Sequence, residues 1–281
     1  MRYQHDLKRG EFAGAIKRRA KLAVKALRAP WVTGSTIRND TERLGVMAGD
    51  TLLVHSSLSS LGFVVGGQST VIRELMAVLG PNGTLVMPTH SWEAAEHGNR
   101  LFNVRNTPSC VGAISEAFRR MPGVRRSLHP THSVAAIGRH ALDIIEGHEH
   151  CETPCGYKSP YWKILAAGGG VLFIGVGLES NTAYHTAEAL ASVPYLLMDS
   201  PDVFEVIDEN AKSRNIRIRR HRAGIPRRFR ELESDLASAS VVRIGTIGTT
   251  RCLLLKGKEF LDRMNEILGK DPNYLLATER K

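Results

Sequence analysis

Short apolar runs alternate with segments of helical periodicity through most of the chain. Residues 49–57, "GDTLLVHSS", predict a buried strand that ends in a serine-rich loop. Val71, Leu75 and Val78 then fall on one stripe of a helix, and residues 84–89, "TLVMPT", predict the next strand. A strand, a helix and a strand in this order form a βαβ unit, in which the crossover is right-handed and the two strands are parallel.

The same alternation continues towards the C-terminus. It predicts helices at 108–121, 159–170 and 258–269, and strands at 132–138, 171–177, 202–207, 215–220, 241–248 and 250–256. We therefore expect an α/β fold with a central mixed sheet, helices on both faces, and antiparallel additions towards the C-terminus. We expect a single domain over residues 36–281, preceded by a basic helix within residues 1–35 that stops at Pro30.

The composition is that of a globular protein. Hydrophobic residues make up 42% of the 281 residues, which is ample for a packed core. No apolar run approaches the roughly 20 residues of a membrane helix, and the N-terminus does not read as a secretion signal, so we expect a cytoplasmic protein outside the membrane. Four cysteines at uneven spacing do not suggest a disulfide framework.

Positive charge is concentrated at the N-terminus and in residues 212–230. The net charge is +10, but aromatic residues are only 6% and no nucleic-acid-binding module is recognisable, so we do not expect a nucleic-acid partner. The basic stretch is expected instead to attract a phosphate or another anionic group. A homo-oligomer is compatible with the sequence.

One short segment is rich in side chains that can bind zinc. Residues 148–155, "HEHCETPC", contain His148, His150, Cys151 and Cys155. None of the usual paired-cysteine spacings is present, and no second ligand pair follows at the distance found in zinc fingers. We therefore interpret the segment as a polar loop and expect no metal.

Polar side chains follow the predicted strands at the points where the strands end. Because parallel strands of an open α/β sheet direct their carboxyl ends to one edge, these side chains are expected to line one cleft. They are His55, Ser56, Ser57, Ser59, Thr89, His90, His185 and Glu188. At helical spacing, His185 could take a proton near neutral pH while Glu188 fixes its tautomer. A metal site and a solvated surface pair are the alternatives for these two residues.

Several common enzyme motifs are absent from the sequence. It has no G-x-S-x-G elbow of a serine hydrolase, no phosphate-binding P-loop and no dinucleotide-binding glycine pattern. Residues 125–138, "RRSLHPTHSVAAIG", place Arg125 and Arg126 beside Ser127. Guanidinium groups beside small hydroxyls suit a phosphate or pyrophosphate, and a pair of surface arginines before a turn is the alternative.

Five blocks of the sequence, in order, resemble the aminoglycoside 3-N-acetyltransferase family. They are "GDTLLVHSSLSSLG", "GPNGTLVMPTHSW", "NTPSCVGAISEAFRRMPGVRRSLHPTHSVAAIG", "TPCGYKSPYWKILAAGGGVLFIGVG" and "NTAYHTAEAL". The likeness covers roughly residues 36–270. It implies an acetyl-CoA-dependent N-acetyltransferase that acts on a primary amine of an aminoglycoside or related amino sugar. It also implies an α/β fold distinct from that of the commoner acetyltransferase superfamily.

The resemblance implies roles for particular residues. His185 would deprotonate the acceptor amine, Glu188 is the first choice for the carboxylate that orients it, and His55 would lie beside the thioester. Glu116 is the second choice for that carboxylate. The residues assigned to the acceptor side are Glu116, His132 and His221. The residues assigned to acetyl-CoA are Ser56, Ser57, Ser59, Ser109, Arg125, Arg126 and Ser127. An amine is mostly protonated at pH 7, so a positioned base is required before it can attack a thioester.

One feature departs from an aminoglycoside-binding protein. Aminoglycosides are polycations and call for an acidic pocket, whereas residues 212–230, around His221, are strongly basic. An anionic amine, such as an amino sugar nucleotide or an amino phosphonate, is therefore a competing acceptor. The sequence is also compatible with a CoA-thioester hydrolase that uses water, and with a CoA- or nucleic-acid-binding protein without activity.

Overall fold

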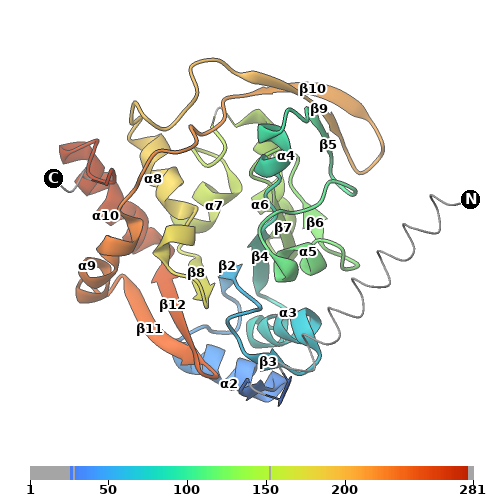
Figure 1. The fold of residues 1–281 in the computed structure, drawn as a ribbon, viewed down its shortest axis with the longest axis vertical. Helices are drawn as coiled ribbons and strands as arrows, with labels where there is room; N and C mark the ends of the chain where they lie inside the picture. Colours follow the sequence, from blue (N-terminus) through green and yellow to red (C-terminus); the bar gives the residue numbers. More distant parts are fainter. Residues whose placement is uncertain (1–25, 28, 152, 278–281) are drawn as a thin grey trace, which may run out of the picture.

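The computed structural model describes residues 26–27, 29–151 and 153–277 (Figure 1). The basic helix expected at the N-terminus falls largely within residues 1–25 and so lies outside the described residues. Strand pairing begins at β1 (Trp31–Val32), which runs parallel to β3 (Phe63–Val64). The residues just before the expected domain boundary therefore pack against the domain.

A seven-stranded mixed sheet forms the centre of the molecule. Its strand order is β11 (Val242–Ile247), β12 (Thr250–Lys256), β8 (Gly170–Ile174), β2 (Thr51–Ser56), β4 (Thr84–Pro88), β7 (Val134–Gly138) and β6 (Arg125–Arg126). Strands β8, β2 and β4 are parallel, whereas β12 and β7 pair antiparallel with the outer two of these three. Helix α3 (Gly67–Leu79) lies between β2 and β4 in the chain, so the predicted βαβ unit is confirmed.

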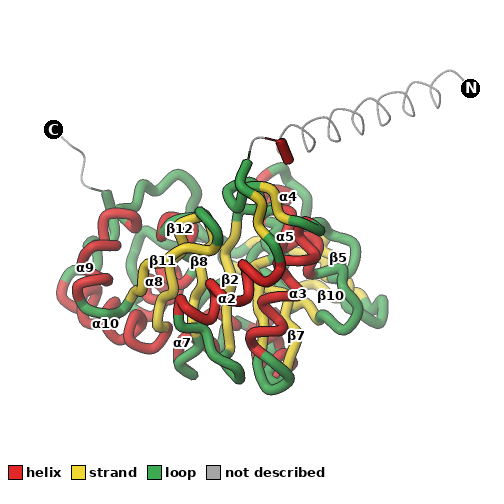
Figure 2. Tube along the Cα trace, turned by 90° about the horizontal axis from the view of Figure 1, so that it is seen from below, coloured by secondary structure: helices red, strands yellow, loops and turns green. Residues whose placement is uncertain are grey.

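Helices cover both faces of this sheet, as predicted. Successive strand residues point to opposite faces, so Leu52 and Leu172 belong to one core while Leu53 and Val171 belong to the other. The first core is covered by α2 (Gly34–Leu44), α3 and α5 (Ala113–Phe118). The second is covered by α6 (Ala141–Ile145), α7 (Pro160–Ala166), α8 (Ala183–Leu190), α9 (Glu233–Ser238) and α10 (Gly257–Lys270). Figure 2, seen from below, shows α2 and α3 in front of the central strands.

The C-terminal strands divide between two sheets. β11 and β12 extend the central sheet as an antiparallel pair, as predicted. β9 (Asp202–Ile207) and β10 (Ser213–Ile218) instead form a separate three-stranded sheet with β5 (Leu101–Asn103), which lies near α4 (Trp92–Glu96) at the top of Figure 1. Exposed and buried residues alternate through the middle of β9 and along the last four residues of β10, which suits a sheet with one face in solvent, whereas β8 is buried on both faces.

The longest helix among the described residues is α10. Its buried residues, Phe260, Leu261, Met264 and Leu268, recur at helical spacing and face the core. Charged side chains cover its other side, as expected for a helix packed on a globular domain. No helix in the described ranges combines the length and apolar character needed to cross a bilayer.

Candidate active site

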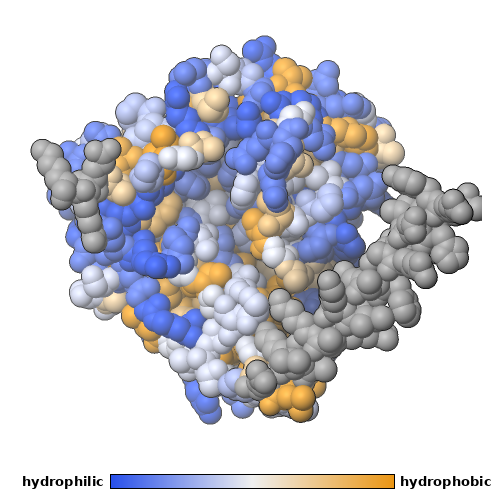
Figure 3. Space-filling model, in the orientation of Figure 1, coloured by the Kyte–Doolittle hydropathy of each residue, from blue (hydrophilic) through white to orange (hydrophobic). Residues whose placement is uncertain are grey.

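A cavity of about 530 Å³ opens at the carboxyl ends of the three parallel strands. Ser56 ends β2, Pro88 ends β4, and Val176 follows β8, and all three residues line the cavity. The sheet edge therefore forms the cleft that the sequence predicts. Figure 3 shows this face of the molecule hollowed near its centre. The volume lies within the usual range for small-molecule sites.

His185 and Glu188 face each other at one side of this cavity. Both lie on α8, one helical turn apart, and His185 Nδ1 is 2.6 Å from Glu188 Oε2. The Glu188 side chain is fully buried, whereas the His185 side chain is 21% exposed and lines the cavity. With Nδ1 bonded to the carboxylate, Nε2 is left to meet a substrate. The structure thus shows the predicted histidine–carboxylate contact with Glu188.

Arg227 completes the arrangement from a distant part of the chain. Its Nε donates a hydrogen bond of 2.8 Å to Glu188 Oε1, so each carboxylate oxygen of Glu188 has its own partner. Burial alone would raise the pKa of Glu188, but the hydrogen bond to His185 and the Arg227 guanidinium outweigh burial and hold this pKa below its ordinary value. Glu188 is therefore ionised at neutral pH and stabilises positive charge on His185.

The chain reaches α8 through a tight connection after β8. The 3-10 turn Leu178–Ser180 follows the strand, and the Asn181 side-chain oxygen accepts a hydrogen bond of 3.0 Å from the Ala183 backbone N–H. This contact satisfies a free donor of the first helical turn. Asn181 Nδ2 is buried without a hydrogen-bond partner among the described residues, and Asn181 lines the cavity.

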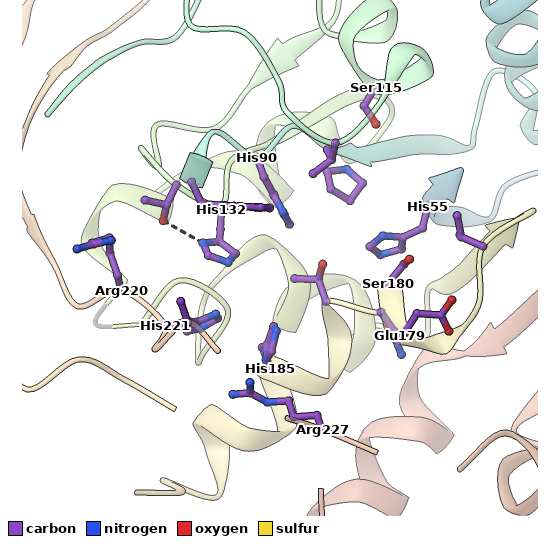
Figure 4. Close-up of a pocket in the computed structure, with 18 of the residues that line it drawn as sticks. His55, His90, Ser115, His132, Glu179, Ser180, His185, Arg220, His221 and Arg227 are labelled. Carbon is purple, nitrogen blue, oxygen red and sulfur yellow. Dashed lines mark hydrogen bonds between the residues drawn. The ribbon is translucent and has the colours of Figure 1, made fainter. Parts of the chain in front are cut away.

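His55 and Ser56 form another part of the wall, at the end of β2. Figure 4 shows the His55 ring in this wall. The His55 ring stacks on Phe173 with 5.2 Å between ring centroids and an interplanar angle of 6°. Burial lowers the pKa of His55 to about 3, so its imidazole is neutral at pH 7. His55 Nε2 and Ser56 Oγ have no hydrogen-bond partner among the described residues. Both are thus buried polar atoms without a partner, in residues that line the cavity.

Three more histidines line the cavity in a row with His185. Ring centroids lie 4.6 Å apart between His185 and His221, 4.6 Å between His221 and His132, and 4.8 Å between His132 and His90 (Figure 4). His90 Nε2 is 2.6 Å from the Tyr161 hydroxyl. Burial lowers the pKa of His132 to about 3 and holds that of His221 well below its ordinary value. The predicted acceptor-side residues His132 and His221 therefore do lie at the cavity.

Other predicted residues lie away from the cavity lining. Ser57 and Ser59 bond to each other, with 3.0 Å between their hydroxyl oxygens, in the loop after β2. Ser109 Oγ accepts a hydrogen bond from the Val111 backbone N–H, and Arg125 is ion-paired with Glu209. Ser127 is buried against His148, 2.9 Å from its Nδ1. The structure does not bring Ser109, Arg125 or Ser127 to the cavity at α8.

Arg126 is buried, contrary to a role as an exposed phosphate ligand. It is 5% exposed, and its guanidinium donates to the backbone oxygens of Thr89 and Thr107, each at 2.6 Å, and to the Ser133 hydroxyl at 3.0 Å. Burial lowers its pKa to about 9, which leaves it charged at pH 7. These hydrogen bonds hold loops of the domain together. They do not fit the expected contact between Arg126 and a CoA phosphate.

Glu116 also has other partners. Its carboxylate accepts hydrogen bonds from Arg119 at 2.5 and 2.7 Å and from the Ser109 backbone N–H at 2.8 Å. It does not line the cavity, and it is not the carboxylate that contacts His185. The second-choice assignment of Glu116, and its place on the acceptor side, are therefore not supported by the geometry.

The basic stretch at residues 212–230 carries less free charge than its composition indicates. Five of its arginines pair with carboxylates from elsewhere in the fold. The pairs are Arg214–Glu149, Arg220–Asp202, Arg222–Asp199, Arg227–Glu188 and Arg230–Glu179. This pairing corrects the expectation of a strongly cationic wall, because net charge along the sequence does not show which charges meet in space.

Sequence reasoning misses some residues of the site and leaves another without a role. Arg227 is one arginine among many in a basic stretch, and nothing in the sequence connects it to Glu188, 39 positions earlier. His90 is predicted to lie in the cleft, but no pattern gives it a function. Asn181 lies in the block "NTAYHTAEAL", directly before the helix that carries His185, and that position is the signal that could have identified it.

The family model and the related sequences that match this chain all belong to one kind of protein. The family model described as aminoglycoside 3-N-acetyltransferase matches residues 53–269. Aminoglycoside N(3)-acetyltransferase VII of Streptomyces paromomycinus is 31% identical over 276 residues, which covers 85% of this chain and 94% of that protein. The prophage-derived aminoglycoside N(3')-acetyltransferase-like protein YokD of Bacillus subtilis (strain 168) is 30% identical over 250 residues, covering 82% of this chain and 90% of that protein.

A solved structure shares most of this fold. A variant of the aminoglycoside acetyltransferase AAC(3)-IVa, crystallised in complex with a gentamicin, superimposes with a TM-score of 0.77 at 30% sequence identity. The match covers 89% of this chain and 93% of the other. The likeness therefore extends over most of the chain rather than over an isolated motif.

Proposed function

The chain belongs to the aminoglycoside 3-N-acetyltransferase family, and on that premise we propose that it transfers an acetyl group from acetyl-CoA to a primary amine of an aminoglycoside. The observation that carries this proposal is the buried Glu188 carboxylate, bonded to both Arg227 and the cavity-lining His185. A histidine held by an ionised carboxylate is suited to accept a proton from an attacking nitrogen.

The chemical step follows from the position of His185. The ammonium form of the acceptor first loses one proton to solvent, and its neutral nitrogen then attacks the thioester carbon while His185 Nε2 takes a second proton from it. Glu188 accepts the hydrogen bond from Nδ1–H and stabilises the imidazolium that forms. When the tetrahedral intermediate collapses, the carbon–sulfur bond breaks, the acetyl group stays on nitrogen, and the CoA sulfur leaves and receives the proton from His185.

The oxyanion of this intermediate needs hydrogen-bond donors. We assign this role to the Ser56 hydroxyl and Asn181 Nδ2, which belong to residues lining the same cavity and have no other partner among the described residues. Donors aimed at the developing charge in a partly enclosed site contribute strongly to catalysis. His55, neutral and stacked on Phe173, would lie beside the thioester on this side of the cavity.

We infer where acetyl-CoA binds from the serine-rich loop after β2. A second cavity of about 640 Å³ is lined by Ser60 and Gly175 and shares Val176 and Glu179 with the lining of the first. We place the pantetheine arm along this shared wall, next to Ser57 and Ser59. The loop and strand backbone there supply the polar groups that such an arm requires.

A cationic acceptor is supported by the charges around the cavity. Glu96 lines it, Glu179 lines it as the ion-pair partner of Arg230, and the arginines that also line it are paired with carboxylates. The composition argument for an anionic acceptor depends on free arginines, and this pairing removes its basis.

The four cysteines are free, which is consistent with the reducing cytoplasm where we place the protein.

A thiol-release assay tests this proposal. The chain is mixed with acetyl-CoA and, in separate reactions, with aminoglycosides, with glucosamine as a singly charged amine, with glucosamine 6-phosphate as its anionic counterpart, and without an amine. We expect thiol release that depends on the aminoglycoside, and a product with one acetyl group on nitrogen by mass spectrometry. Release without an amine, or only with the phosphorylated amine, would overturn the assignment.

A further inference from the structure

Three side chains from distant parts of the sequence meet where His132 and His221 line the cavity. The ligand atoms of His132, Cys155 and His221 all lie within 4.8 Å of one another. His132 precedes β7, Cys155 lies in the loop before α7, and His221 follows β10. None of these residues has a part in the proton transfer proposed above. Two imidazoles and a thiol converging on one point are a donor set typical of zinc.

The His132 ring is oriented as a metal ligand would be. Its Nδ1 is 2.9 Å from the Thr131 hydroxyl, which leaves Nε2 for the point where the three side chains converge. A metal-binding histidine commonly uses its other ring nitrogen in such a bond, which fixes the tautomer and the ring direction. Thr131 is itself fully buried, so this contact is held by the fold.

The ring nitrogens of His221 lack hydrogen-bond partners among the described residues. Both of these nitrogens are buried. A buried polar atom without a partner destabilises the folded state. A metal ion bound to one of these nitrogens would remove that destabilisation, and Figure 4 shows the His221 ring directed towards His132.

Cys155 supplies the third donor. It is fully buried and forms no disulfide. Sulfur combined with imidazole nitrogen selects zinc over magnesium or calcium, which prefer oxygen ligands. A carboxylate that would attract those harder cations is not part of this group of side chains.

From these contacts we propose that His132, Cys155 and His221 form a zinc site. With three protein ligands, a tetrahedral ion keeps one position open. Because His132 and His221 both line the cavity, the open position faces the cavity and is available to water or to a substrate group. The ion also ties together three loops, one of which carries His221 to within 4.6 Å, between ring centroids, of the base His185.

Metal content tests this proposal independently of acetyl transfer. The full-length chain, purified without a histidine tag, is dialysed against zinc and then against metal-free buffer, and bound zinc is measured by mass spectrometry. We expect about one zinc per chain. Replacement by cobalt should add a thiolate-to-cobalt absorption band, and zinc should raise the melting temperature, because it binds only the folded chain.

Variants separate this site from adventitious binding. Cys155→Ala and His221→Ala should lose the bound zinc and the cobalt band, whereas Cys252→Ala, which removes a buried cysteine elsewhere, should keep both. Thr131→Val should retain the ligands but weaken zinc binding roughly 10–100-fold. His221→Ala keeps the test valid if Cys155→Ala does not fold, because His221 lies in a loop. A wild-type chain without zinc, or zinc retained in both ligand variants, would overturn the proposal.

Discussion

Glu188 accepts a hydrogen bond from His185 across 2.6 Å, and no part of the Glu188 side chain is exposed to solvent. The pair joins a buried, ionised carboxylate to a ring that reaches the substrate cavity. Because the carboxylate is fixed by Arg227 on its other oxygen, the histidine is held in one tautomer and one orientation. The tautomer and the position of the ring are thus set by the same contact.

Glu188→Gln should lower kcat on the order of 10²-fold while the chain remains folded. The amide keeps the size of the side chain but cannot stabilise the imidazolium. Thiol release at saturating acetyl-CoA and aminoglycoside measures the effect. A kcat close to that of the wild type would show that the carboxylate does not serve the base.

Arg227→Met should reduce kcat by roughly 10-fold or more, with a smaller change in the KM for acetyl-CoA, because Arg227 acts through Glu188. Arg222→Met is the matched control. Arg222 lines the same cavity but pairs with the exposed Asp199, so its loss should leave kcat nearly unchanged. Equal losses of kcat in both variants would mean that cavity charge, and not the contact with Glu188, is what matters.

Arg126→Ala should destabilise the fold rather than weaken acetyl-CoA binding. The change removes the side-chain donor to the Thr107 backbone oxygen and leaves the Thr89 backbone oxygen with only the Ser133 hydroxyl as a side-chain donor, at a cost of roughly 2–4 kcal/mol in the free energy of unfolding. Urea titration measures this loss, and calorimetry measures acetyl-CoA affinity at a temperature where the variant is folded. Arg125→Ala, which removes an exposed arginine of the same strand, should change neither quantity much. If Arg126→Ala left stability unchanged but weakened acetyl-CoA binding, Arg126 would be a phosphate ligand of acetyl-CoA after all.

Stability should depend on pH through Glu74. This side chain is 5% exposed and accepts hydrogen bonds from Arg38 at 2.6 Å and Arg73 at 3.1 Å. Burial raises its pKa, but the two arginines outweigh burial and lower the pKa below the ordinary value. The folded state therefore gains stability while Glu74 is ionised, and this gain is lost as pH falls through the lowered pKa.

Glu74→Gln should accordingly be less stable than the wild type at pH 7 by about 1–2 kcal/mol, and the two should converge as the pH falls through the lowered pKa of Glu74. Urea unfolding at several pH values checks this. Glu259→Gln, a change at an exposed glutamate of α10, provides the comparison and should follow the wild-type curve. A difference between Glu74→Gln and the wild type that does not depend on pH would show that packing, and not charge, accounts for the loss.

Much of the fold follows from local patterns. The βαβ unit, the buried strand β8 and the helix carrying His185 are predictable, because apolar runs and helical stripes report burial directly. The separation of β9 and β10 into a small sheet is not, because strand patterns do not specify a partner strand. Strand-end position also locates His55, Ser56 and His185, since it fixes which side chains can share a cleft.

The remaining site residues depend on contacts between distant segments. Arg126 looks like a phosphate ligand in sequence but is enclosed by protein groups, because residue type does not show burial. In the sequence Cys155 stands beside His148, His150 and Cys151, whereas its partners in space are His132 and His221. The spacing rules for zinc apply to ligands on one segment, so they do not detect a site assembled from three.

The most direct test is single-turnover acetyl transfer by His185→Gln, with acetyl-CoA affinity measured on the same preparation. If the imidazole removes the proton from the acceptor amine, the rate falls by about 10²- to 10⁴-fold while acetyl-CoA binds as it does to the wild type. A variant that transfers the acetyl group at the wild-type rate would contradict the assignment of His185 as the base.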